Sequence, residues 1–291
     1  MDATSSTVVV LDDQDQVLRP ALLWMDVRAV EEAEQIRATN QEALRLAGNG
    51  PVSAEWGLPK SMWIKKHEPQ IFERAAVICD ETDWLVNRLT GQWTMSVAHA
   101  AGKYFYDDDL GGWPTSLYQE LDAEDILATF PPVTQIGEVV GTLVPEVADE
   151  LGLSPETIVV EGGIDAYVGA VGLGVAEPGR LALITGSSHV ITGQLDKPLY
   201  ATGLWGSFTG ATVPGYYTID GGQTSTGSIV EWFRRNLAGA SQLEALKSDR
   251  RVLDVLTEAA SRVPIGSDGL VMLDHFQGNR APHFDARSRG A

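Results

Sequence analysis

The sequence predicts an α/β fold, and one continuous stretch carries most of that prediction. Residues 144–153 have the pattern of a short helix, and the β-branched run 157–160 directly after it is typical of a strand. Two glycines and a lone acid, Asp165, then lead into a run of glycine and alanine, which lets a helix pack closely on a sheet. Helix, strand, glycine turn and helix form the repeating pattern of α/β proteins, whose ligands bind beyond the carboxyl ends of strands.

The first part of the chain opens on apolar runs. Residues 7–11 and 21–24 are strand-like and flank an acidic turn, so they predict a hairpin. An amphipathic helix is expected from Val30 onward, with Gly48 as its C-cap.

The remaining elements follow from the same signals of periodicity and glycine or proline punctuation. Helices are expected over 57–69, 80–91 and 241–262, a hairpin over 179–195, a strand turning into a helix over 215–239, and a buried strand over 268–276.

Length and a change of texture after Gly179 indicate two domains. A chain of 291 residues is long enough for about two units with a substantial core. We place the boundary near residue 176, which gives an N-terminal unit over 1–176 and a C-terminal unit over 177–291.

The charge balance excludes several partner classes. A net charge of −19 argues against nucleic acid or an anionic membrane as the main partner. Cys79 is the single cysteine, so neither a disulfide framework nor a cysteine-based zinc site is expected. No apolar run approaches the roughly 20 residues that span a bilayer, and the first residues do not resemble a signal peptide. A cytoplasmic protein is expected.

The common catalytic signatures are missing from the sequence. It has no GxxxxGK[ST] loop, GxGxxG turn, HExxH helix or GxSxG elbow, and its histidines show no metal-ligand spacing. The absence of the elbow disfavours an α/β hydrolase.

Acids and small residues nevertheless gather where predicted strands end. Asp26 and Arg28 follow one strand and suit a polyol, because the acid accepts hydrogen bonds and the guanidinium donates them. Asp165 and Asp220 follow two others, each beside paired glycines. Each acid can also be read as an ordinary helix cap.

A turn of small residues offers a second kind of site. Thr185, Gly186 and Ser187 lie between two predicted strands, where backbone N–H groups and hydroxyls can form a nest for phosphate. An ordinary hairpin turn explains the same residues. Acids and an anion-binding turn together are the profile of a site for a hydroxylated substrate and a phosphate.

Taken in order, seven blocks of the chain resemble the FGGY family of carbohydrate kinases, which phosphorylate sugars and polyols with ATP. The similarity runs through nearly the whole chain. The blocks are LLWMDVRA, GLPKSMWIKKH, DWLVNRLTG, VVEGGIDAYVGAVGLG, LALITGSSHV, DGGQTSTGSIVEWF and FQGNRAPHFDARSRG. The resemblance implies an actin-like ATPase fold with two ribonuclease-H-like domains and an active site in the cleft between them.

The resemblance also implies roles for individual residues. Asp165 matches the catalytic base, with an indirect contact to Mg²⁺ at most. Sugar-binding positions and the phosphate-binding turn are matched by further residues: Asp26, Arg28, Lys60 and Asp220 for the sugar, and Thr185, Gly186 and Ser187 for phosphate. ATP, Mg²⁺ and a pentulose such as D-ribulose are the expected small-molecule partners, and a homodimer is the expected assembly.

The chain departs from the family pattern in three places. Gly57 and Ser61 replace residue types usual beside Lys60, which weakens that match. No counterpart of the family's Gly-Asp-x-Gly-Thr phosphate loop or of its glycine-rich adenine-binding segment is found. The sequence is therefore expected to be an incomplete kinase with little activity of its own. A non-catalytic sugar-binding or regulatory homologue is the alternative.

Overall fold

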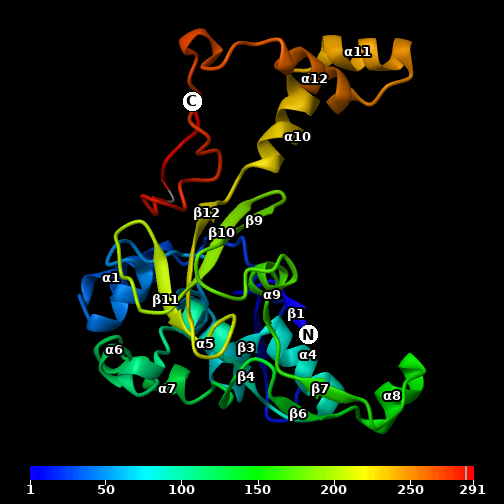
Figure 1. Ribbon diagram of the computed structural model, residues 1–291. Helices are drawn as coiled ribbons and strands as arrows, with labels where there is room; N and C mark the ends of the chain where they lie inside the picture. The colour runs from blue at the N-terminus through cyan, green and yellow to red at the C-terminus, as the bar shows by residue number, and fades with distance from the viewer. Residues whose placement is uncertain (286) are drawn as a thin grey trace.

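The computed structural model describes residues 1–285 and 287–291, and its largest sheet lies in the second half of the chain. This four-stranded antiparallel sheet has the order β11-β12-β10-β9 (Figure 1). Its strands are β9 (Leu181–Thr185), β10 (His189–Leu195), β11 (Trp205–Thr209) and β12 (Tyr217–Gln223). The hairpin predicted over 179–195 is confirmed as β9 and β10, with His189 opposite Thr185.

The first half of the chain contains four two-stranded pairings. Two are parallel, β1 (Asp2–Ala3) with β8 (Gly163–Ile164) and β4 (Met95–Ser96) with β5 (Val133–Thr134). Two are antiparallel, β2 (Val8–Leu11) with β3 (Val77–Asp80) and β6 (Val139–Thr142) with β7 (Ile158–Val160). The parallel pairing of β1 with β8 places residues 4–6 beside the strand end that carries Asp165.

Helices surround these strands. In the first half they are α1 (Val30–Ala38), α2 (Gly57–His67), α3 (Pro69–Phe72), α4 (Glu81–Thr90), α5 (Val97–Tyr104), α6 (Thr115–Glu120), α7 (Glu124–Leu127), α8 (Pro145–Leu151) and α9 (Asp165–Gly172). Short 3-10 helices cover Glu42–Ala47, Asp108–Leu110 and Ser267–Gly269. The second half adds α10 (Gly227–Asn236), α11 (Gly239–Ser248) and α12 (Val252–Ser261), which rise above the sheet in Figure 1.

An aromatic cluster joins the two halves of the chain. Trp56 packs against Phe105, with ring centroids 5.1 Å apart, and against Trp205 of β11, at 5.4 Å. Phe208 of β11 lies against the same indole. All four side chains belong to one buried cluster, so the sheet of the second half packs directly on helices of the first.

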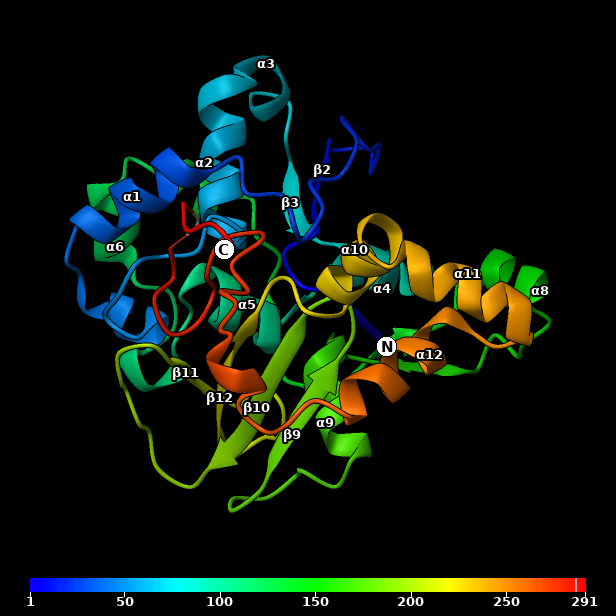
Figure 2. The same cartoon turned by 90° about the horizontal axis from the view of Figure 1, so that it is seen from above.

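The C-terminal loop returns to the first half of the chain. Arg287 forms an ion pair with Glu34 of α1, and Phe284 stacks on Trp205 at 5.2 Å. Figure 2 shows this loop beside α1. Within the described part of the chain, no helix is long and apolar enough to cross a membrane.

Several predicted elements differ from those observed. Residues 7–11 and 21–24 meet only at the antiparallel bridge of Val8 with Leu22, and a second bridge joins Leu11 to Val17; the regular ladder of β2 is the one with β3. The helix expected from Val30 to Gly48 is interrupted at Asn40, which has a left-handed φ of 51°; asparagine tolerates this conformation well. The C-cap at Gly48 is confirmed.

The prediction of a buried strand over 268–276 was wrong. Residues 270–273 form no strand with the described residues, and their side chains are exposed, Val271 by 81%. An apolar run adopts strand structure only where a neighbouring strand satisfies its backbone, and none lies beside this one among the described residues.

Candidate active site

A cavity of about 370 Å³ lies at the carboxyl ends of β1 and β8 and is closed on its other side by the large sheet. Its walls come from both halves of the chain. Residues that line the cavity include Thr4, Ser5, Ser6, Trp24, Glu55, Trp56, Lys103, Asp165, Thr185, Gly186, Ser187, Trp205, Asp220 and Arg280.

Asp165 is the first residue of α9 and faces this cavity. The N-cap of the helix is Ile164, so the carboxylate does not occupy the capping position. Its Oδ1 accepts a hydrogen bond from the N–H of Ala166 at 2.7 Å, and the side chain is exposed to solvent. Partial burial by the cavity walls raises the pKa of Asp165. This carboxylate is free to accept a proton from a molecule in the cavity.

Asp220 and Lys103 line the same cavity from different halves of the chain. Asp220, on β12, is buried, and its Oδ2 accepts a hydrogen bond from the Tyr167 hydroxyl at 2.7 Å. Lys103, on α5, is also buried, and its ammonium lies 5.6 Å from the Trp56 ring and 5.3 Å from the Trp205 ring. Burial lowers the pKa of Lys103, while the charge of Asp220 opposes that change.

The predicted phosphate turn connects β9 to β10 and is open to solvent. Thr185, Gly186 and Ser187 line the cavity. The carbonyl of Ser187 accepts hydrogen bonds from the N–H groups of Thr226, at 2.9 Å, and Ser228, at 3.3 Å. The start of α10 therefore fixes the turn, and the geometry is that of a hairpin turn whose outer face meets the cavity.

Three predicted sugar-binding residues do not line this cavity. Arg28 Nη2 lies 2.7 Å from Asp26 Oδ2, and the Arg28 guanidinium stacks over Trp63, so the two side chains bind each other at the surface. Lys60 is fully buried, and burial lowers its pKa to about 8. Its ammonium donates to the carbonyls of Ser6, at 2.8 Å, Leu23, at 2.7 Å, and Trp24, at 3.2 Å. Lys60 supports two segments of the cavity wall and makes no contact with its interior.

The cavity also contains residues that sequence analysis missed. Arg280 forms a bidentate ion pair with Glu55, with both N–O distances at 3.0 Å. Lys103 was detectable in principle, because a single lysine in the apolar stretch VAHAAGKY is unusual for a solvated helix face. The pairing of Glu55 with Arg280 was not detectable, because 225 positions separate the two residues.

Comparison with known proteins decides the family. The N-terminal domain of the FGGY family of carbohydrate kinases matches residues 2–172, and the C-terminal domain of the same family matches residues 181–291. The chain belongs to the FGGY family of carbohydrate kinases.

Curated relatives of this FGGY chain carry kinase names. It is 33% identical to Ribulokinase 2 of Staphylococcus saprophyticus, over the whole chain and 57% of the relative. It is 29% identical to xylulose kinase of Bacillus subtilis, over 98% of the chain and 54% of that relative. The chain spans little more than half the length of the curated relatives it matches.

Solved structures of sugar kinases share the fold of this FGGY chain. A gluconate kinase from Lactobacillus acidophilus aligns with a TM-score of 0.83 at 23% identity, covering all of this chain and 57% of its own. A xylulose kinase from Rhodospirillum rubrum aligns with a TM-score of 0.79 at 28% identity, covering 98% and 55%. The predicted α/β, actin-like ATPase fold is confirmed, whereas a boundary at residue 176 stays a prediction.

Proposed function

We propose that the protein transfers the γ-phosphoryl group of ATP to a hydroxyl of a pentulose, with Asp165 as the general base. One observation carries the proposal: Asp165, Lys103 and Asp220 line one cavity together with the exposed turn at 185–187. The family and the kinase names of its members support the reaction type.

The sugar side of the cavity combines donors and acceptors. Lys103 offers N–H donors, Asp220 offers a carboxylate, and Ser5 and Ser6 offer hydroxyl or backbone groups. Trp24, Trp56 and Trp205 add apolar ring surface. A polyhydroxylated chain needs this mixture, because each buried hydroxyl requires a partner.

Asp165 performs the proton transfer in this proposal. As the sugar oxygen forms its bond to the γ-phosphorus, its proton moves to the Asp165 carboxylate, and the bond from phosphorus to the bridging oxygen of ADP breaks. The raised pKa of Asp165 strengthens it as a base.

The phosphate side is formed by the turn at 185–187. Its backbone and hydroxyl groups suit an anion. Asp165, the first residue of α9, places a carboxylate in the same cavity. Mg²⁺ favours oxygen ligands and keeps several waters, so one carboxylate fits an indirect contact with the ion. In this proposal Mg²⁺ enters with ATP as part of the substrate.

A pentulose is the proposed sugar because the curated relatives include a ribulokinase and a xylulose kinase. D-Ribulose is the first choice. A cytoplasmic location and a homodimer accompany the proposal as predictions.

A substrate panel tests the proposal. Because the chain itself is expected to have little activity, the panel uses the protein at the full length of its relatives, incubated with ATP and Mg²⁺ and, in turn, D-ribulose, L-ribulose, D-xylulose, gluconate and glycerol, and products are identified by mass spectrometry. We expect a pentulose phosphate as the main product, and calorimetry should show that the same pentulose binds the protein. Phosphorylation of gluconate or glycerol alone would contradict the pentulose assignment. Absence of any phosphorylated product would contradict the proposed function.

A further inference from the structure

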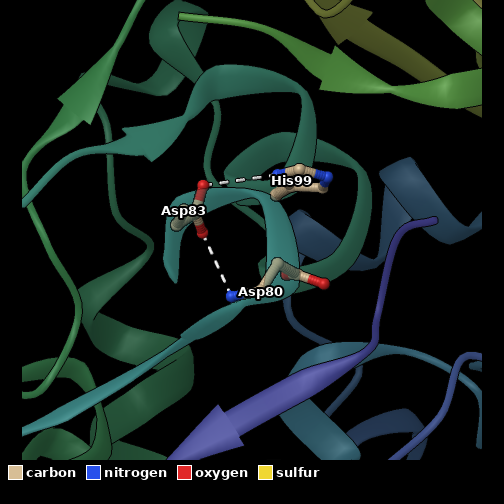
Figure 3. A group of neighbouring side chains, drawn as sticks. All are labelled: Asp80, Asp83 and His99. Atoms are coloured by element: carbon tan, nitrogen blue, oxygen red, sulfur yellow. Dashed lines mark hydrogen bonds and ion pairs between the residues drawn. The ribbon is translucent and has the colours of Figure 1, made fainter. Parts of the chain in front are cut away.

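Three side chains with metal-binding chemistry converge in the core of the first half of the chain. Asp80 ends β3, Asp83 lies in the first turn of α4, and His99 lies on α5. One ligand atom from each lies within 4.8 Å of the others (Figure 3). The spacing of the histidines in the sequence gave no sign of this cluster, because the fold brings α5 against the start of α4.

All three side chains are fully buried, and the imidazole has unused polar atoms. Each residue has a relative exposure of 0%. Among the described residues, neither ring nitrogen of His99 has a hydrogen-bond partner, whereas the Asp80 carboxylate belongs to the capping box of α4 and lies near the Tyr104 hydroxyl. A buried polar atom without a partner is destabilising, and more so if it is charged, so the imidazole in this place requires an explanation.

Backbone groups hold Asp83 in place. Its Oδ2 accepts a hydrogen bond from the N–H of Asp80, and its Oδ1 accepts one from the N–H of Ser96, both at 3.1 Å. His99 Nδ1 lies 3.5 Å from the same Oδ1, which is longer than a normal hydrogen bond. Figure 3 shows dashed contacts that run from Asp83 to each of the other two residues. The Asp83 carboxylate therefore faces His99 but does not form a normal hydrogen bond with it.

The surrounding charge favours a cation in this place. The carboxylates of Asp80 and Asp83 have oxygens within 4.8 Å of a His99 ring nitrogen, and Glu161 is close enough to interact electrostatically with Asp83 and His99. A cation among these groups balances the negative charge.

We propose that Asp80, Asp83 and His99 bind one divalent first-row transition-metal ion, such as Zn²⁺ or Mn²⁺. Two carboxylates and one imidazole are common donors for these ions, and ligand atoms around a bound ion lie about 3–4 Å apart, a spacing that small side-chain rotations can reach from 4.8 Å. The imidazole nitrogen disfavours Mg²⁺, which prefers oxygen. A dipositive ion with two carboxylates is neutral, so the buried site avoids a net charge.

This metal site is separate from the nucleotide chemistry of the cavity and does not depend on the proposed function. It joins β3 and α4 to α5. Lys103, one helical turn beyond His99 on α5, lines the cavity, so metal loading stabilises the helix that carries this lysine.

Metal content and thermal stability of the intact chain test the proposal. The purified protein is stripped with a chelator, dialysed, and reloaded separately with Zn²⁺, Mn²⁺ and Mg²⁺. We expect about one equivalent of Zn²⁺ or Mn²⁺ to be retained per chain, with Tm raised by about 5 °C relative to the stripped protein. The same concentration of Mg²⁺ should leave Tm unchanged.

Two histidine variants locate the ion. His99→Asn should weaken metal binding at least about tenfold. His67→Asn is the matched control, because His67 Nε2 also lies 3.5 Å from a carboxylate oxygen, that of Glu32, but at the surface. Retention of the metal by His99→Asn, or loss in His67→Asn, would place the ion elsewhere. No retained metal and no change in Tm for the unmodified protein would overturn the proposal and leave His99 as the protonated centre of an ion triad.

Discussion

The ammonium of Lys103 lies inside the cavity on a residue that is only 6% exposed, and no hydrogen bond among the described residues uses it. Contacts with two tryptophan rings stabilise its charge less than water does, which is why burial lowers its pKa. A sugar hydroxyl in the cavity would supply the missing acceptor. Lys103 is thus expected to contribute to substrate affinity more than to folding.

Replacing Lys103 by methionine tests this expectation. Methionine keeps the apolar stem against the tryptophans and removes the donors, so sugar affinity should fall at least about tenfold while Tm stays within a few degrees. Calorimetry with the pentulose selected by the substrate panel measures the affinity. Lys66→Met, at an exposed lysine paired with Glu31, is the control and should bind normally. Equal affinity in the two variants would remove Lys103 from the sugar site.

At the residue scale, the sequence predicted which polar side chains belong to the site better than it predicted what each of them binds. Asp165 and Asp220 were identified as strand-end acids, and both line the cavity, but only Asp165 follows its strand, β8, whereas Asp220 lies in the middle of β12. Asp26 and Arg28 showed the same local signal but bind each other. The Lys60 ammonium donates its hydrogen bonds to carbonyls of residues that lie 36 or more positions away in the sequence. Local pattern reveals a polar side chain at a strand end, whereas its partner is decided by contacts distant in sequence.

At the scale of elements, the turn at 185–187 depends on the start of α10. A Cβ on Gly227 would lie 2.3 Å from the carbonyl oxygen of Gly186, which is closer than atoms can approach. The contact explains why a glycine follows Thr226 here. The side of α10 that faces the turn is packed against backbone.

Gly227→Ala should therefore displace the turn and destabilise the protein by about 1–3 kcal/mol. Thermal unfolding measures the effect. Gly239→Ala, at the first residue of α11, is the control, since a Cβ there meets no atom within 4 Å, and it should be neutral or slightly stabilising. If both variants unfold at the temperature of the unmodified protein, the packing described for Gly227 is incorrect.

Helices whose ends are marked by glycine or proline were predicted best. Gly91, with a φ of 71°, ends α4 as expected, and Pro69 begins α3, a separate short helix, after α2. The expected helix over 241–262 is divided into α11 and α12, with Asp249 in a left-handed conformation between them. Apolar periodicity alone did not show such breaks, because asparagine and aspartate can adopt this conformation without glycine.

At the scale of the whole molecule, two kinds of contact bring the second half of the chain onto the first. One is the aromatic cluster around Trp56 and Trp205. The other is the ion pair of Glu55 with Arg280, whose side chains are 11% and 10% exposed. Both border the cavity. The resemblance to a kinase family indicated a cleft between two units, and only the structure identifies the groups that form its walls.

The most direct test of the account is the turnover of Asp165→Asn in the protein at the full length of its relatives, measured with ATP, Mg²⁺ and the preferred pentulose, alongside calorimetric sugar affinity. The amide keeps the shape of the side chain but cannot accept the proton. We predict a fall in kcat of at least about a hundredfold, with the sugar dissociation constant changed by no more than about twofold. Unchanged turnover in this variant would contradict the account, because Asp165 would then be only the first residue of a helix.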